Sequence, residues 1–294
     1  MELTDISFIL QKIRIMKRIA AVTMVRNGGF FLEKWVQYYG SQLGKENLYV
    51  YFDGEDQTVP DFAVDCHTEL VPRVAGSVRE ADKGRIAFIS SKTAGLFKKY
   101  DMVLGTDVDE FLIVDPALGV SLPEFLSALD TNGRISCSGL GCDVVQNLSC
   151  ENELDRSRGI LEQRSFVYLS TRYTKTTVLC KPVPWGSGFH RTRKGNFHIV
   201  KDLYLFHFGC ADVPETEQKL LDEDLSARGW GRHLNKRLRL IQRVSSLPVR
   251  DWNVWTRRAR LIQTVVRPPY MWNKPAMLGL RILLRIPDRF KNTV

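Results

Sequence analysis

The sequence lacks several patterns that would assign it to a class at once. None of its six cysteines forms a C-x-x-C pair or has a histidine at zinc-site spacing. This argues against a zinc site and favours reduced, packed thiols in a cytosolic protein. The one apolar-leaning stretch near the start, residues 6–19, is interrupted by four basic residues, so it is typical of neither a secretory signal nor a membrane-spanning helix.

The composition is that of a globular protein, but the charge is unevenly distributed. Of 294 residues, 44% are hydrophobic and 26% are charged, which excludes a disordered or fibrous chain. The net charge is +9, yet residues 231–294 hold fifteen Lys and Arg against two Asp, a net of +13, which leaves −4 for residues 1–230. We expect one domain over residues 1–212 and a helical, basic C-terminal region over residues 213–294.

Apolar strands alternate with amphipathic helices through the first third of the chain. We expect strands at 18–25, 48–52, 69–74 and 102–105, and helices after Gly29 and at 79–97. Further along, we expect a helix at 121–129, strands at 134–141, 166–169, 176–180 and 203–208, and a polar loop over 143–158. This order predicts an α/β fold with a mostly parallel sheet flanked by helices.

An acidic cluster, Asp107, Asp109 and Glu110, follows the apolar run 102–105. Alternate residues of an extended chain point the same way, so we expect Asp107 and Asp109 to face one site. Carboxylates that close repel each other unless a cation lies beside them. The pattern therefore favours a metal site at the carboxyl edge of the sheet, and a solvated acidic turn between two strands is the alternative.

Polar residues also follow the first two strands. Arg26 and Asn27 lie in the turn after the first strand, where phosphates or a base would bind. Asp53 ends the second strand, either as an acceptor for a base or ribose or as the first residue of a turn.

Two stretches, MVRNGGFFLEKWVQYY and KGRIAFISSKTAGLFKKYDMVLGTDVDEF, resemble GT-A glycosyltransferases, in particular a family-2-like bacterial branch with an Asp-x-Asp-Glu-Phe motif. The resemblance covers residues 19 to about 115, and the remainder more loosely. It implies a Rossmann-like GT-A fold, a nucleotide-sugar donor, a divalent metal (Mn²⁺ or Mg²⁺) and a glycan or glycolipid acceptor. Lys83, Arg85 or Lys181 would then add charge to the donor's phosphates, with simple solvation as the alternative.

The resemblance also implies that His207, in LYLFHF, completes a metal shell with Asp107 and Asp109. Taken alone, a histidine among such residues is more often a core residue.

If the enzyme inverts, as the resemblance implies, a carboxylate must deprotonate the acceptor. We assign this base to Asp143, with Glu151 and Asp155 as alternatives, although the Gln-x-x-Arg-Trp signature of the family is not evident.

The C-terminal region is predicted to form helices at 215–228, 233–244, 252–266 and 276–286. Its arginines and aromatic residues, including Trp252, Trp255, Tyr270 and Trp272, suit an anionic membrane surface on the inner face of the membrane. Packing on the first domain is the alternative, and nucleic acid ranks below both because no nucleic-acid-binding motif accompanies the charge.

The sequence thus predicts a cytoplasmic, metal-dependent glycosyltransferase. The alternatives are a non-catalytic membrane or nucleic-acid adaptor on a degenerate transferase fold, and a phosphohydrolase of the haloacid-dehalogenase kind. The latter places its Asp-x-Asp after the first strand, whereas here the motif follows the fourth predicted strand.

Overall fold

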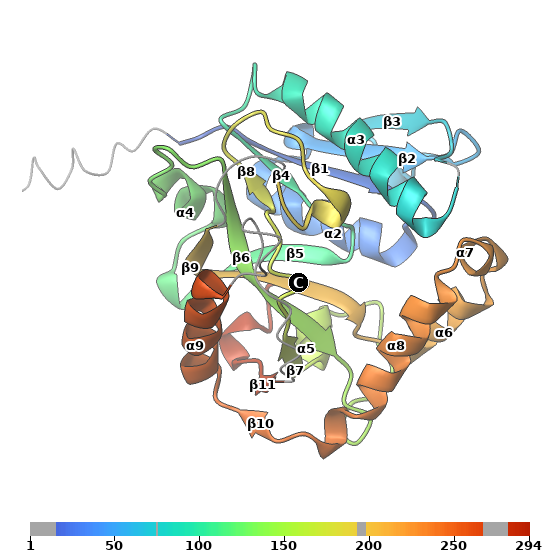
Figure 1. Ribbon diagram of the computed structural model, residues 1–294, viewed down its shortest axis with the longest axis vertical. Coiled ribbons are helices and arrows are strands. Elements are labelled where there is room, and N and C mark those ends of the chain that lie inside the picture. Colours follow the sequence, from blue (N-terminus) through green and yellow to red (C-terminus); the bar gives the residue numbers. More distant parts are fainter. Residues whose placement is uncertain (1–15, 75, 193–197, 267–281) are drawn as a thin grey trace, which may run out of the picture.

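Strand β1 (Ile19–Val25) lies at the centre of the first half of the fold in the computed structural model, which describes residues 16–74, 76–192, 198–266 and 282–294. It pairs in parallel with β2 (Leu48–Asp53) and β4 (Met102–Gly105), and β3 (His67–Val71) pairs in parallel with β2. Alternate residues of β1 pack against helices α2 (Gly29–Leu43) and α3 (Val78–Leu96), on opposite faces of the sheet. The predicted α/β class, with a parallel sheet flanked by helices, is confirmed (Figure 1).

Beyond β4 the sheet becomes mixed. Strand β8 (Val178–Leu179) is antiparallel to both β4 and β6 (Ser136–Val145), and β6 is antiparallel to β7 (Phe166–Leu169). Strand β9 (Ile199–Cys210) is parallel to β6 and antiparallel to β5 (Glu110–Val114). The prediction of a polar loop starting at residue 143 is wrong at its beginning, because β6 continues to Val145 and all ten of its residues are buried in the sheet.

The C-terminal region contains helices and also returns to the sheet. Helices α6 (Val213–Leu221), α7 (Glu223–Ala227), α8 (Gly231–Gln242) and α9 (Trp252–Val265) agree with the predicted ones. Strand β11 (Leu283–Arg285) is antiparallel to β7 and parallel to β10 (Val249–Arg250). The predicted helix at 276–286 is therefore wrong at 283–285, where two buried leucines extend the sheet, and residues 276–281 lie outside the described part, as do Tyr270 and Trp272. The boundary at residue 212 stays a prediction.

Two short helices, α4 (Leu122–Ala128) and α5 (Ile160–Gln163), complete the fold. The core is rich in aromatic residues where β9, α9 and the last turn meet, and Phe290 contacts the rings of Tyr204, Phe206 and Trp252 there. Among the described residues, no helix is both long and apolar enough to cross a membrane.

Candidate functional site

The pairing of three neighbouring strands brings a histidine between two acidic residues. His207 of β9 lies opposite Glu110 of β5 and opposite Asp143 of β6. Because directly opposed residues point to the same face, the three side chains lie side by side. The Nδ1 atom of His207 is 2.6 Å from Asp143 Oδ1, and its Nε2 atom is 3.4 Å from Asp109 Oδ2. The ring of Tyr173 stacks on the imidazole at a centroid distance of 3.7 Å.

The acidic cluster is a turn rather than an extended segment. The backbone N–H of Glu110 donates to the carbonyl oxygen of Asp107 at 3.1 Å, which closes a turn between β4 and β5. The argument that Asp107 and Asp109 face one site by strand alternation is therefore wrong. The alternative, an acidic turn between two strands, describes the backbone correctly, but Glu110 is fully buried rather than solvated.

Asp107 is held by two cations. Arg85 of α3 donates from Nη1 to Asp107 Oδ1 at 2.6 Å, and Lys175 donates from Nζ to Oδ2 at 2.9 Å. The same Lys175 ammonium lies 2.5 Å from Glu110 Oε1, and the Lys175 side chain is only 3% exposed. One buried ammonium thus joins the two carboxylates.

The charges of this site shift the pKa values of its members. Burial raises the pKa of Glu110 to about 7, against the opposing effect of Lys175. Burial disfavours ionised Asp107 too, but Arg85 and Lys175 outweigh it and hold the Asp107 pKa below its usual range. For His207, burial is likewise outweighed by Asp109 and Asp143, whose carboxylates raise the histidine pKa to about 9. The site therefore separates ionised Asp107 from a largely protonated Glu110 near neutral pH.

Asp109 and His207 fit a divalent cation as a pair of ligands. Two ligands of one ion, each about 2.0–2.2 Å from it, lie roughly 3.0–3.5 Å apart, and Asp109 Oδ2 and His207 Nε2 are 3.4 Å apart. Asp143 binds the other ring nitrogen, as carboxylates beside metal-ligating histidines do. Gly209 keeps the ring accessible, because a Cβ there would lie 2.7 Å from His207 Nε2.

The fit is incomplete with protein atoms alone. Within the described ranges, no three His, Cys, Asp or Glu side chains group as ligands of one ion. The Asp107 carboxylate bonds Arg85 and Lys175, so its predicted part in metal binding stays a prediction. Mg²⁺-type sites with one or two protein ligands are completed by water and by substrate phosphates.

The predicted nucleotide residues lie along the carboxyl edge of the parallel strands. Arg26 follows β1 and binds Asp56 through both guanidinium nitrogens at 2.7 and 2.8 Å. Asn27 has a φ of 51° and donates its backbone N–H to Gln57. Asp53, at the end of β2, accepts from Arg73 and from the backbone N–H of residue 74, both at 2.7 Å. Because β1, β2 and β4 are parallel, these residues and Asp107 share one edge of the sheet.

The other predicted residues lie apart from this cluster or have other partners. Lys83 and Lys181 are exposed, and it is Arg85 and Lys175 that bond the acidic turn. Glu151 is half-buried and accepts from the backbone N–H groups of residues 147 and 165. Asp155 is exposed and caps the turn at residue 157.

Sequence reasoning did not select three residues of the site. Lys175 and Tyr173 belong to a polar stretch between β7 and β8 that carries no recognisable motif. Arg237 of α8 places Nη2 3.5 Å from His207 Nε2, although the sequence shows it only as one of many arginines in the basic region. Only the folding of distant segments onto the β5–β9 pair reveals these contacts.

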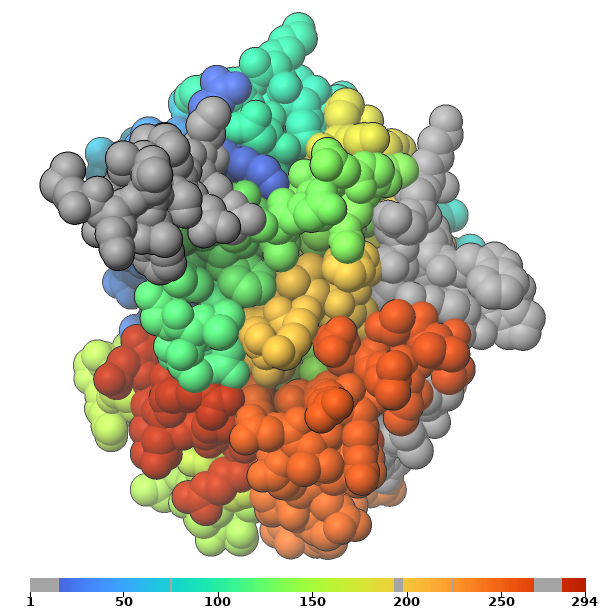
Figure 2. Space-filling view, turned by 90° about the vertical axis from the view of Figure 1, so that its left-hand side faces the viewer, coloured from blue at the N-terminus to red at the C-terminus, as the bar shows by residue number. Residues whose placement is uncertain are grey.

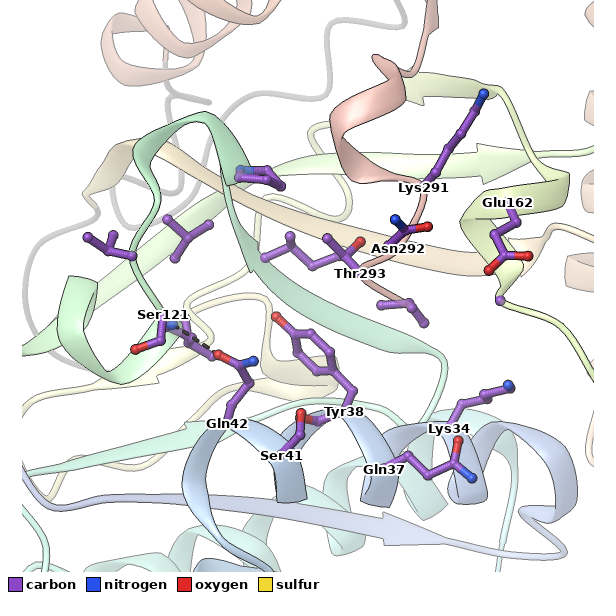
Figure 3. A pocket seen from close by; sticks show the side chains of 17 residues that line it. Lys34, Gln37, Tyr38, Ser41, Gln42, Ser121, Glu162, Lys291, Asn292 and Thr293 are labelled. Carbon is purple, nitrogen blue, oxygen red and sulfur yellow. Dashed lines mark hydrogen bonds between the residues drawn. The ribbon is translucent and has the colours of Figure 1, made fainter.

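A cavity of about 590 Å³ lies at the other end of β5 (Figure 3). It is formed by one side of α2, by Ile113 and Val114, and by residues 291–294. Tyr38 points into this region, and its hydroxyl donates to the carbonyl oxygen of Leu112 at 2.7 Å. None of the residues of the acidic turn lines this cavity.

Comparisons with known proteins do not assign a family. No protein-family model matches the chain, and no curated protein matches it. Among solved structures, one similar chain is the crystal structure of mannose-1-phosphate geranyltransferase from Thermus thermophilus. The two share 10% sequence identity with a TM-score of 0.28, over 94% of this chain and 77% of that chain. A likeness this weak establishes neither a shared fold family nor a shared activity.

Proposed function

We propose that this protein is a metal-dependent glycosyltransferase of the GT-A type, which transfers a sugar from a nucleotide-diphosphate sugar to a glycan or glycolipid acceptor. The observation that carries the proposal is the junction at the carboxyl edge of the sheet. There the pair Asp109 and His207, with Asp143 behind the histidine, lies beside the cations Arg85 and Lys175. A diphosphate leaving group requires this combination of a cation site and positive side chains.

Each residue has a defined part in the proposed reaction. Asp109 and His207 would hold Mn²⁺ or Mg²⁺, which as a Lewis acid stabilises the charge that develops on the diphosphate. Arg85 and Lys175 neutralise Asp107 and supply positive charge at the same edge. Arg26, Asn27 and Asp53 line the part of this edge where the nucleoside would bind.

The role of Asp143 separates two versions of the mechanism. As the base of an inverting reaction, it would have to reach the acceptor hydroxyl. Its carboxylate instead lies 2.6 Å from His207 Nδ1 and is 8% exposed, which favours a role in orienting the imidazole. Glu151 and Asp155 remain the alternative candidates for the base.

Calorimetric titration with UDP and GDP, with and without Mn²⁺, tests the donor site. We expect Mn²⁺-dependent binding of one nucleotide, and we expect Asp109→Ala to abolish it. Asp65→Ala is the matched control, because Asp65 is 69% exposed and forms only a 3.4 Å pair with Lys45. Binding of neither nucleotide by the folded protein would contradict the proposal and favour an adaptor, whereas hydrolysis of a phosphomonoester would favour a phosphohydrolase.

Asp143→Asn distinguishes the two roles of Asp143. An orienting residue predicts a metal affinity about 10–100-fold lower in the variant. A catalytic base predicts unchanged metal and nucleotide binding together with loss of turnover.

A further inference from the structure

Helix α9 buries its more polar stripe and exposes its more aliphatic one. Its buried residues follow each other at intervals of four, three and four positions: Trp252, Thr256, Ala259 and Gln263. Thr256 and Gln263 are satisfied inside, since Thr256 donates to the carbonyl oxygen of residue 252 and Gln263 accepts from Thr174 at 2.6 Å. The opposite stripe has the same spacing: Val254, Arg258, Leu261 and Val265.

The aliphatic residues of the outer stripe are strongly exposed. Val254 is 44% exposed, Leu261 is 65% exposed and Val265 is 71% exposed. Single exposed aliphatic residues are common on protein surfaces, but three at one helical spacing form a continuous stripe. Figure 2 faces the side of the molecule on which α9 lies, and the orange to orange-red C-terminal helical region forms part of the outer surface there.

The charge around this stripe has one sign. Helix α9 contains three arginines and no acidic residue. Arg257 and Arg258 are exposed, and so is Arg250 in the short strand before the helix. The nearest carboxylate in the chain, Asp251, is the N-cap of α9 and accepts from the backbone N–H of Val254 at 2.8 Å.

We propose that the α9 face, formed by Val254, Leu261, Val265, Arg250, Arg257 and Arg258, docks on the surface of an anionic lipid bilayer. Aliphatic residues flanked by arginines gain both from burial at the headgroup boundary and from attraction to anionic lipid. A nucleic acid would leave the aliphatic stripe without a partner, and a second copy of the same face would bring like charges together. The α9 face does not include the nucleotide edge, so the proposal is independent of the donor chemistry.

Co-sedimentation of the full chain with vesicles tests this proposal. We expect binding to phosphatidylcholine vesicles that contain phosphatidylserine, and much weaker binding to phosphatidylcholine alone. Leu261→Ser/Val265→Ser removes two exposed aliphatic side chains and is expected to lower partitioning about tenfold or more. Arg257→Gln/Arg258→Gln is expected to lower it by about ten- to thirtyfold.

Val64→Ser/Leu118→Ser is the matched control, because these residues are 62% and 45% exposed and lie on other elements. It should bind vesicles as the native chain does. Nucleotide binding should be the same in all three double variants, which separates a failure of this proposal from a failure of the donor site.

Three results would overturn the proposal. One is equal binding to neutral and anionic vesicles or to neither, and another is anionic binding that survives both α9 double variants. The third is self-association of the native chain without lipid that the serine variant abolishes, since this would assign the α9 face to a second copy of the chain.

Discussion

Replacing Lys175 with methionine removes the buried ammonium that contacts both Asp107 and Glu110 while keeping a side chain of similar length. Glu110 is fully buried, so its carboxyl loses its ion-pair partner without gaining water. Removing one partner from a buried ion pair typically costs about 3–5 kcal/mol of unfolding free energy. We expect Lys175→Met to fall in this range, because Arg85 continues to neutralise Asp107 but does not bond Glu110.

Urea denaturation measures this loss. With a slope of about 3 kcal/mol/M for a chain of this size, the midpoint should fall by about 1–1.5 M. The double variant Lys175→Met/Glu110→Gln removes the unpaired carboxyl and should recover about 1–3 kcal/mol relative to the sum of the single variants. Lys45→Met, which breaks an exposed pair, should change stability by less than about 1 kcal/mol. A midpoint for Lys175→Met close to the native one, or strictly additive effects in the double variant, would refute this reasoning.

The remaining predictions concern packing and the anchoring of the C-terminal end, and each is measured by urea or thermal denaturation. Gly141→Ala should prevent stable folding or cost more than about 3 kcal/mol, because a Cβ would overlap the backbone of residues 170–174. Gly95→Ala in α3 has no atom within 4 Å of the new Cβ and should instead stabilise the protein by about 0.5–1 kcal/mol. If both substitutions had the same sign, the close approach at Gly141 would be contradicted. Phe290→Ala should cost about 3–5 kcal/mol, because this ring is fully buried, and a cost under about 1 kcal/mol would argue against the aromatic cluster. Arg289→Met breaks two hydrogen bonds to Asp115, of 2.6 and 2.8 Å, and should cost about 1–3 kcal/mol, whereas Lys291→Met, in an exposed pair, should cost under about 1 kcal/mol.

The elements of the first half of the chain were predictable because their signals are local. The strands at 18–25 and 48–52 and the helix at 79–97 are read from the periodicity of apolar residues, and the structure has them within two residues. Two elements were not predicted correctly. Strand β6 extends through Asp143 although its sequence becomes polar there, and Leu283–Arg285 is a strand although its pattern suggested a helix. In both cases pairing with distant strands outweighs the local preference.

By itself, the sequence determined the α/β class, the acidic cluster at the end of β4 and the uneven charge, since these depend on residues that are adjacent along the chain. Only the tertiary structure decided which groups meet at the site. The register of β5, β6 and β9 puts Asp143 against His207, and the segment between β7 and β8 supplies Lys175 to the acidic turn. Strand register and loop placement depend on contacts between residues far apart in sequence, and no spacing within one segment encodes them.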